Sequence, residues 1–204
     1  MKRPEFIARQ AANPQGIVGR VIAQIMSWET SALNVEAVAL LGVAQADRVL
    51  EVGFAHGLTV ERIAAAAPEG FVAGVDVSES MTRVAASRNR RAVNAGRVEL
   101  RTGTSASLPF DDAVFDKALA VHTVYFWNDV PTHLRELRRV LRPGARFVLA
   151  FTPSTSARAE QFPASVYTFY DEPTLLGMLA AAGFSETEVR HVGEAVLVAT
   201  QVRR

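Results

Sequence analysis

The chain has 204 residues, of which 49% are apolar, so it is long enough for one sizeable domain with its own hydrophobic core. It carries 22 Lys and Arg against 21 Asp and Glu, and the formal net charge of +1 gives no electrostatic case for binding nucleic acid or an anionic membrane surface. The lack of cysteine excludes disulfides, thiolate catalysis and cysteine-based zinc sites.

Residues 1–45 are expected to be helical and to precede the first strong strand. Apolar residues at helical spacing predict one helix over 16–26 and another over 33–41, with a break near Thr30 and Ser31. We expect an N-terminal extension, either a lid or a dimer contact, on a domain of residues 46–204 in a monomer or homodimer. Since we find neither a signal peptide nor an apolar run of about 20 residues, we expect a cytoplasmic protein without a membrane span.

From residue 48 onward, short apolar runs alternate with helical patterns. Strands are predicted over 48–52, 71–75, 98–101, 115–121 and 146–151, and helices over 58–67, 79–93, 129–141 and 171–182. This alternation predicts a mostly parallel sheet with right-handed crossovers. Two further runs, 187–192 and 195–200, meet at Gly193, and so short a connection joins only antiparallel strands. The predicted fold class is therefore α/β, with a parallel sheet completed by an antiparallel hairpin.

The turn after the first strand is rich in glycine and reads Leu50-Glu-Val-Gly-Phe-Ala-His-Gly-Leu58. Glycines let a ligand approach the backbone, and the following helix start offers free N–H groups. A dinucleotide fingerprint requires glycine at its first, third and sixth positions, which are here Gly53, Ala55 and Leu58. The turn therefore suggests a nucleotide ligand other than a dinucleotide, while two glycines alone would also suit an ordinary turn.

This turn resembles the E/D-x-G-x-G-x-G loop of class I S-adenosylmethionine-dependent methyltransferases, with Ala55 in place of the middle glycine. Residues 103–116 resemble the family segment G-D-A-x-x-L-P-F-x-x-x-x-F-D, with Thr104 in the Asp position. Residues 134–145 resemble L-x-E-x-x-R-V-L-K-P-G-G, with Ala145 in place of the last glycine. Together with Asp76 after the second strand, these segments most resemble the ubiquinone and menaquinone methyltransferase-like branch, methyltransferase type 11.

The resemblance implies a Rossmann-like sheet of seven strands in the order 3-2-1-4-5-7-6, mostly parallel with the last strand antiparallel, and helices on both faces. It also implies S-adenosylmethionine as cofactor and S-adenosylhomocysteine as product. Asp76 is expected to accept hydrogen bonds from both ribose hydroxyls, although NAD enzymes use a similar acid and a helix N-terminal acid is the alternative. Thr104 and the Ser105 N–H are expected to meet the adenine. Further cofactor contacts are expected at Glu51, Gly53, Phe54, Ala55, Gly57, Val77, Met81 and His122.

The stretch after the fourth strand, residues 121–127, is expected to border both cofactor and acceptor. His122 is a candidate base for an acceptor proton, with a hydrogen bond to cofactor or backbone as the alternative, and Tyr125 is a second candidate. The expected acceptor pocket is lined by Met26, Trp28, Tyr125, Trp127, Tyr167 and Tyr170. The four histidines show no zinc-ligand spacing, so no metal is expected.

These observations predict a methyltransferase that acts on a small molecule by direct in-line transfer, a reaction that needs positioning and no catalytic triad. Nucleic acid is not an expected partner, since an N/D-P-P-Y/F tetrapeptide is missing after the fourth strand. A non-catalytic module that kept the fold is an alternative favoured by Ala55 and Thr104. A nicotinamide-dependent oxidoreductase is a further alternative, against which the missing fingerprint glycine argues.

Overall fold

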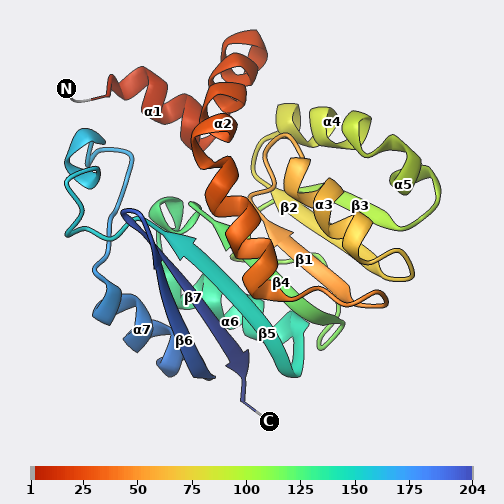
Figure 1. Cartoon of the computed structure of the whole chain (residues 1–204). Coiled ribbons are helices and arrows are strands. Elements are labelled where there is room, and N and C mark those ends of the chain that lie inside the picture. The colour runs from red at the N-terminus through yellow and green to blue at the C-terminus, as the bar shows by residue number, and fades with distance from the viewer. Residues whose placement is uncertain (1–2, 204) are drawn as a thin grey trace.

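The computed structural model describes residues 3–203, apart from the side chains of Ile17, Gln24 and residues 26–29. Its centre is one seven-stranded sheet in the order β3-β2-β1-β4-β5-β7-β6 (Figure 1). The strands are β1 (Arg48–Val52), β2 (Phe71–Asp76), β3 (Val98–Thr102), β4 (Phe115–Val121), β5 (Leu141–Phe151), β6 (Phe184–Val192) and β7 (Ala195–Val202). Strands β1 to β5 pair in parallel, whereas β7 is antiparallel to both β5 and β6. The predicted fold class, strand order and antiparallel last strand are confirmed.

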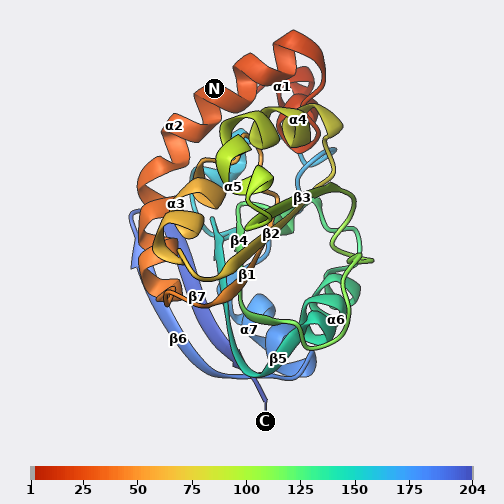
Figure 2. The ribbon, with the colours of Figure 1, turned by 90° about the vertical axis from the view of Figure 1, so that its right-hand side faces the viewer.

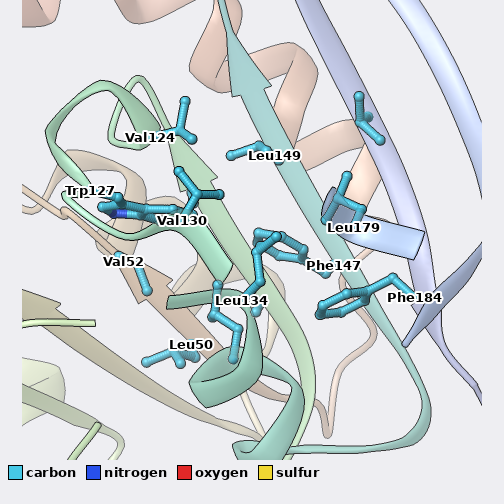
Figure 3. Packing of buried hydrophobic residues seen from close by; sticks show 14 of the residues in the cluster. Leu50, Val52, Val124, Trp127, Val130, Leu134, Phe147, Leu149, Leu179 and Phe184 are labelled. Atoms are coloured by element: carbon cyan, nitrogen blue, oxygen red, sulfur yellow. The ribbon is translucent and has the colours of Figure 1, made fainter. Parts of the chain in front are cut away.

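Helices cover both faces of this sheet (Figure 2). One face carries α2 (Gly16–Leu41), α3 (Leu58–Ala66), α4 (Glu79–Arg88) and the short α5 (Arg90–Asn94), and the other carries α6 (Val130–Val140) and α7 (Glu172–Ala181). Strands covered on both faces need apolar residues on both, which is why the strands read as continuous apolar runs. Figure 3 shows the α6 and α7 side, where Leu134 and Leu179 pack near Phe147 and Phe184.

Helix α2 is one unbroken helix of 26 residues, so the predicted break near Thr30 is wrong. Thr and Ser lower helix propensity by only about 0.5 kcal/mol each, and they do not end a helix whose later turns are held by packing. Those later turns bury Leu33 and the residues 37, 40 and 41 in the same core cluster as Val49 of β1. Gly42, with a φ of 63°, ends the helix.

The N-terminal part of the chain projects beyond the sheet (Figure 1). It consists of α1 (Glu5–Ala12) and the first half of α2, and α1 packs against α2. None of the helices in residues 3–203 combines the length and apolar character that crossing a bilayer requires.

The predicted helix over 79–93 is interrupted at Asn89, which separates α4 from α5. The buried Asn89 side chain donates hydrogen bonds to the carbonyl oxygens of Gly57 (3.0 Å) and Ala85 (2.9 Å). Asn89 therefore ties the end of α4 to the glycine-rich turn, a role that a helical pattern in the sequence does not reveal.

Candidate functional site

A cavity of about 250 Å³ lies at the carboxyl ends of β1, β2 and β4. The strand order reverses between β1 and β4, and ligands of open α/β sheets bind outside the carboxyl ends of the strands at such a switch point. The cavity is further enclosed by α1, α2 and the connection of residues 152–169 that follows β5. Of the predicted site residues, those that line it are Glu51, Gly53, Phe54, Ala55, Asp76, Val77, Met81, Thr104, Ser105, His122, Tyr125, Trp127 and Tyr167.

The glycine-rich turn takes its shape from backbone conformation. Gly53 has a φ of 76°, and its N–H donates to the Val75 carbonyl at 2.8 Å. A Cβ atom at Gly53 would overlap the side-chain methyl of Thr123. Ala55 also has a positive φ, 47°, which costs an L-residue about 1–2 kcal/mol, and its N–H donates to Asp76 Oδ2 at 2.8 Å. Asp76 thus holds the turn in the conformation that a middle glycine would adopt without strain.

Gly57 does not belong to the cavity lining, contrary to its expected cofactor contact. A Cβ atom there would lie 2.6 Å from the Cβ of Ala85 and 2.8 Å from Asn89 Nδ2. With a φ of 77° it starts α3, and its missing side chain lets that start approach α4 closely. The structure therefore gives Gly57 a packing role.

Two buried carboxyl groups form the acidic end of the cavity. Glu51 is 5% exposed, and its Oε2 has no hydrogen-bond partner among the described residues. Burial, together with the nearby charge of Asp76, raises the pKa of Glu51 to about 8. Asp76 is 8% exposed and accepts the N–H groups of Ala55 and Ser78, each at 2.8 Å, through different oxygens. Burial raises the pKa of Asp76, while these two hydrogen bonds oppose the rise.

More polar atoms in the cavity wall lack partners within the described chain. They are His56 Nε2, Thr123 Oγ1 and Tyr167 Oη, and all three residues line the cavity. Buried polar atoms are nearly always hydrogen-bonded in folded proteins, and each one left unpaired costs about 1–3 kcal/mol. Their gathering here, with Glu51, indicates a ligand that supplies several hydrogen-bonding groups and a positive charge.

A flat wall closes the cavity beside the end of β3. Ser105 Oγ lies 2.7 Å from His133 Nδ1, and the His133 ring stacks on the Trp127 indole with centroids 4.9 Å apart and planes 3° apart. The Thr104 hydroxyl accepts the Ala106 N–H at 3.2 Å and so caps its own turn. Sequence reasoning considered His133 only as a zinc ligand; its position beside Leu134, on the buried face of α6, was the available signal.

The half-buried His122 and the buried Tyr125 form a pair. His122 Nδ1 lies 2.9 Å from the Tyr125 hydroxyl, which also accepts the Thr152 N–H. Burial, and to a smaller extent the charge of Arg158, lowers the pKa of His122 to about 4, and burial raises that of Tyr125 to about 12. Both side chains are therefore neutral near pH 7. A neutral imidazole with so low a pKa is only a weak proton acceptor, which favours a hydrogen-bonding role for His122.

The other end of the cavity is aromatic and carries two arginines. The rings of Tyr125, Phe126, Phe162, Tyr167 and Phe169 lie 4.6–6.1 Å from one another in their contacting pairs. Arg3 and Arg158 line the same end. The sequence did not reveal Arg3, which precedes α1, or Arg158, Phe162 and Phe169 of the 152–169 connection. These residues lie in irregular segments, which carry no periodic pattern.

Three expected acceptor-pocket residues need separate mention. Tyr170 is absent from the described cavity lining, and its carbonyl accepts the Ser154 N–H at 2.9 Å. Tyr170 lies outside the lining because it follows the segment that covers the cavity and immediately precedes Asp171, the N-cap of α7. The side chains of Met26 and Trp28 lie outside the described part of the chain.

Comparison with known proteins gives a consistent family assignment. The family described as "Methyltransferase domain" matches residues 50–149. The uncharacterized methyltransferase YdaC of Bacillus subtilis is 27% identical over 170 residues, which cover 83% of this chain and 89% of YdaC. The putative methyltransferase YrhH of the same organism is 30% identical, and the match covers 60% of this chain and 67% of YrhH.

Two further comparisons concern the acceptor and the fold. The demethylmenaquinone methyltransferase of Symbiobacterium thermophilum is 33% identical, and the match covers 71% of this chain and 58% of that protein. The crystal structure of a SAM-dependent methyltransferase from Aquifex aeolicus superposes with a TM-score of 0.72 at 22% identity. That superposition covers 83% of this chain and 89% of the Aquifex chain, and it supports the fold.

Proposed function

This chain belongs to the class I S-adenosylmethionine-dependent methyltransferases, and from that premise we propose that it methylates a small molecule inside the cavity at the switch point. Its cofactor is S-adenosylmethionine. The alternatives of a nicotinamide-dependent oxidoreductase and of a non-catalytic module are set aside with the family assignment. The observation that carries the proposal is the pair of buried carboxyl groups beside the glycine-rich turn.

The residues at the acidic end fit this cofactor. Glu51 Oε2 is an unpartnered buried carboxyl oxygen, which suits the positively charged methionine part of the cofactor. Each Asp76 oxygen accepts one N–H and keeps one lone pair, which suits the two ribose hydroxyls. The missing side chain of Gly53 leaves its backbone open, and the Trp127–His133 wall beside Ser105 suits a flat purine.

When bound, S-adenosylmethionine supplies an electrophilic methyl group on a positively charged sulfur, and an acceptor lone pair displaces that sulfur in line. The protein's part is to bind, orient and exclude water, and such positioning lowers barriers by about 7–11 kcal/mol in favourable cases. His122 and Tyr125 are assigned to orienting the reactants, since the low pKa of His122 makes it a weak base and the high pKa of Tyr125 keeps its hydroxyl protonated. Val77, Met81 and Phe54 complete the cofactor side.

A small acceptor is supported by the closure of the cavity. The segments that cover it are α1, α2 and residues 152–169, and they leave a volume just below the range of about 300–1,000 Å³ of small-molecule sites. The name of the Symbiobacterium relative also specifies a small-molecule acceptor. The division into an extension of residues 1–45 and a domain of residues 46–204 is part of the proposal, with α1 and the first half of α2 as the lid.

The test is a calorimetric titration with S-adenosylhomocysteine and, separately, with NADH. We expect the first to bind and the second not to bind. Asp76→Asn should weaken the affinity for S-adenosylhomocysteine more than tenfold, because one oxygen that faces the turn becomes an amide nitrogen. Asp112→Asn, at an exposed carboxylate paired with Arg139, is the matched control and should leave the affinity unchanged. No binding of S-adenosylhomocysteine to the unaltered protein would refute the proposal.

A further inference from the structure

The turn of residues 103–105 lies beside the position proposed for the ribose. The parallel pairing of β2 and β3 continues to Asp76, and the Gly103 N–H donates to the Asp76 carbonyl at 2.9 Å. Ser105 and Val77 both line the cavity, and Val77 is 51% exposed, so it offers an apolar surface that a flat base would cover. A base joined to a ribose at Asp76 would therefore meet this turn.

Two neighbouring hydroxyl groups of the turn could meet the base, and they differ in their surroundings. Thr104 is exposed, and its hydroxyl already accepts the Ala106 N–H at 3.2 Å. Ser105 is 5% exposed, and its Oγ lies 2.7 Å from His133 Nδ1. Water can replace a ligand at an exposed hydroxyl, whereas a buried hydrogen-bonding group is costly to leave unpaired. Ser105 is therefore better placed than Thr104 to distinguish one base from another.

The hydrogen bond with His133 leaves the Ser105 oxygen able to accept another. Burial lowers the pKa of His133, so its ring is neutral near pH 7, with one nitrogen that donates and one that accepts. A serine hydroxyl has one proton to donate and two lone pairs that accept. If Nδ1 accepts the Ser105 proton, both lone pairs stay free, and if Nδ1 donates, one stays free. In either tautomer of His133, Ser105 Oγ can therefore accept an N–H group from a ligand.

The loop that carries Ser105 is fastened to α6, the helix that carries His133. The Leu108 N–H donates to Glu136 Oε2 at 2.9 Å, and the Arg139 guanidinium donates to the Leu108 carbonyl at 3.0 Å. These contacts lie within the protein, so they hold Ser105 and His133 together before any ligand binds. Groups that are already in place lose less freedom on binding, which favours a specific contact.

We propose that the Ser105 hydroxyl, oriented by His133, accepts a hydrogen bond from the exocyclic amino group of adenine and makes the site select this base. The inference rests on the proposed function and identifies the side chain that recognises the base of the cofactor. Ser105 is the specificity-determining residue, and His133 is a positioning residue that acts through it. Thr104 caps its own turn. A purine without the amino group would leave the Ser105 oxygen without this partner.

The test is calorimetric titration of the full-length protein with S-adenosylhomocysteine and with its analogue whose purine carries hydrogen in place of the amino group. We expect the unaltered protein to bind S-adenosylhomocysteine at least tenfold more tightly than the analogue. Ser105→Ala should reduce this preference at least fivefold and leave the affinity for the analogue within threefold. Ser107→Ala, at an exposed serine of the same loop outside the cavity lining, is the matched control and should keep the preference.

Variants of the two neighbouring residues test the roles assigned to them. Thr104→Ala should change the preference less than twofold. His133→Leu should reduce it at least threefold, because Ser105 loses the atom that orients its hydroxyl. His133→Asn, whose amide puts a polar atom near the place of Nδ1, should keep at least half of the preference. A role of His133 in packing alone would not predict this rescue.

The outcomes separate this inference from the proposed function. Equal affinities of the unaltered protein for the two ligands, or a full preference in Ser105→Ala, would overturn the inference and leave the methyltransferase proposal standing. A loss of preference in Thr104→Ala as large as that in Ser105→Ala would also overturn it. If Ser105→Ala binds neither ligand, Ser105→Cys, with a similar size and a much weaker acceptor, gives the same comparison. If the unaltered protein binds neither ligand, the proposed function fails, and the inference fails with it.

Discussion

Gly53 and Ala55, two of the three residues of positive φ in the glycine-rich turn, differ in what a side chain costs. At Gly53 a side chain would both strain the backbone and overlap Thr123, whereas at Ala55 an alanine already bears the strain. We expect Gly53→Ala to lower the free energy of unfolding by about 1–3 kcal/mol and to weaken S-adenosylhomocysteine binding. Ala55→Gly should change stability by no more than about 1 kcal/mol, in the stabilising direction. Urea denaturation of both variants checks this, and an equal loss in the two would contradict it.

His122 is the residue for which structure changes the expectation most. A general base contributes typically about 10²–10⁴-fold to rate, but an imidazole with a pKa of about 4 is a poor proton acceptor. We expect His122→Asn to lower kcat/KM less than tenfold once an acceptor is identified, since Asn tolerates the φ of 55° found here. Tyr125→Phe is the companion variant. A loss above a hundredfold for His122→Asn would restore the base role.

The sequence predicts the positions of some site residues and not of others. Glu51 and Asp76 lie at the carboxyl ends of apolar strands within recognisable motifs, so their meeting at one sheet edge was predictable. Arg3 and Arg158 are separated by most of the chain, and they share a cavity only because α1 folds back onto the 152–169 connection. The positive φ of His122, which sets where its ring points, also has no sequence signal.

Secondary-structure elements were predicted well where a pattern and a motif agreed. The strand order followed from the family resemblance and the hairpin from the short connection at Gly193, and the structure bears out both. The predicted break in α2 is wrong because the weak helix propensity at Thr30 does not end the helix. The packing that keeps α2 intact comes from strands that are distant in the sequence. Asn89 shows the opposite error, in which a helical pattern hid an interruption.

Helix α1 is the element whose function is most directly testable. It contributes Ala11 and Ala12 to the cavity wall and packs mainly on α2. We expect deletion of residues 1–12 to leave S-adenosylhomocysteine affinity within threefold and to raise the KM for the methyl acceptor, once one is identified, at least fivefold. Light scattering of the same protein reports the oligomeric state. Loss of a dimer with an unchanged KM for the acceptor would favour the dimer-contact alternative over the lid.

The stability of the whole molecule depends on a buried acid, Glu51, whose Oε2 has no hydrogen-bond partner among the described residues. Glu51 has a pKa of about 8 when folded and about 4.5 in the unfolded chain, so the folded protein keeps a proton that the unfolded chain has lost. The free energy of unfolding should therefore fall as pH rises from about 4.5 to 8. The lowered pKa of His122 acts oppositely, and only as pH falls below about 6.5. Between pH 6.5 and 8 the comparison with Glu51→Gln assigns the slope to Glu51.

We expect the ligand-free protein to lose roughly 1–2 kcal/mol of unfolding free energy between pH 6.5 and 8. Glu51→Gln should remove this slope and bind S-adenosylhomocysteine more weakly. Denaturant titrations at four pH values measure the slope, and Glu61→Gln, at a half-exposed carboxyl on α3, is the matched control. A slope that persists in Glu51→Gln would assign the titration to another group.

The continuity of α2 determines where the entrance to the cavity can open. A helix anchored in the core through residues 33–41 cannot swing about its own middle, so a hinge must lie in the three residues that join it to α1. Within that joint the Pro14 carbonyl is fastened to the Ser78 hydroxyl. In the proposed lid role, the eight residues of α1 are the part that rotates outward, and this movement breaks the hydrogen bond from the Arg3 N–H to the Gln161 carbonyl.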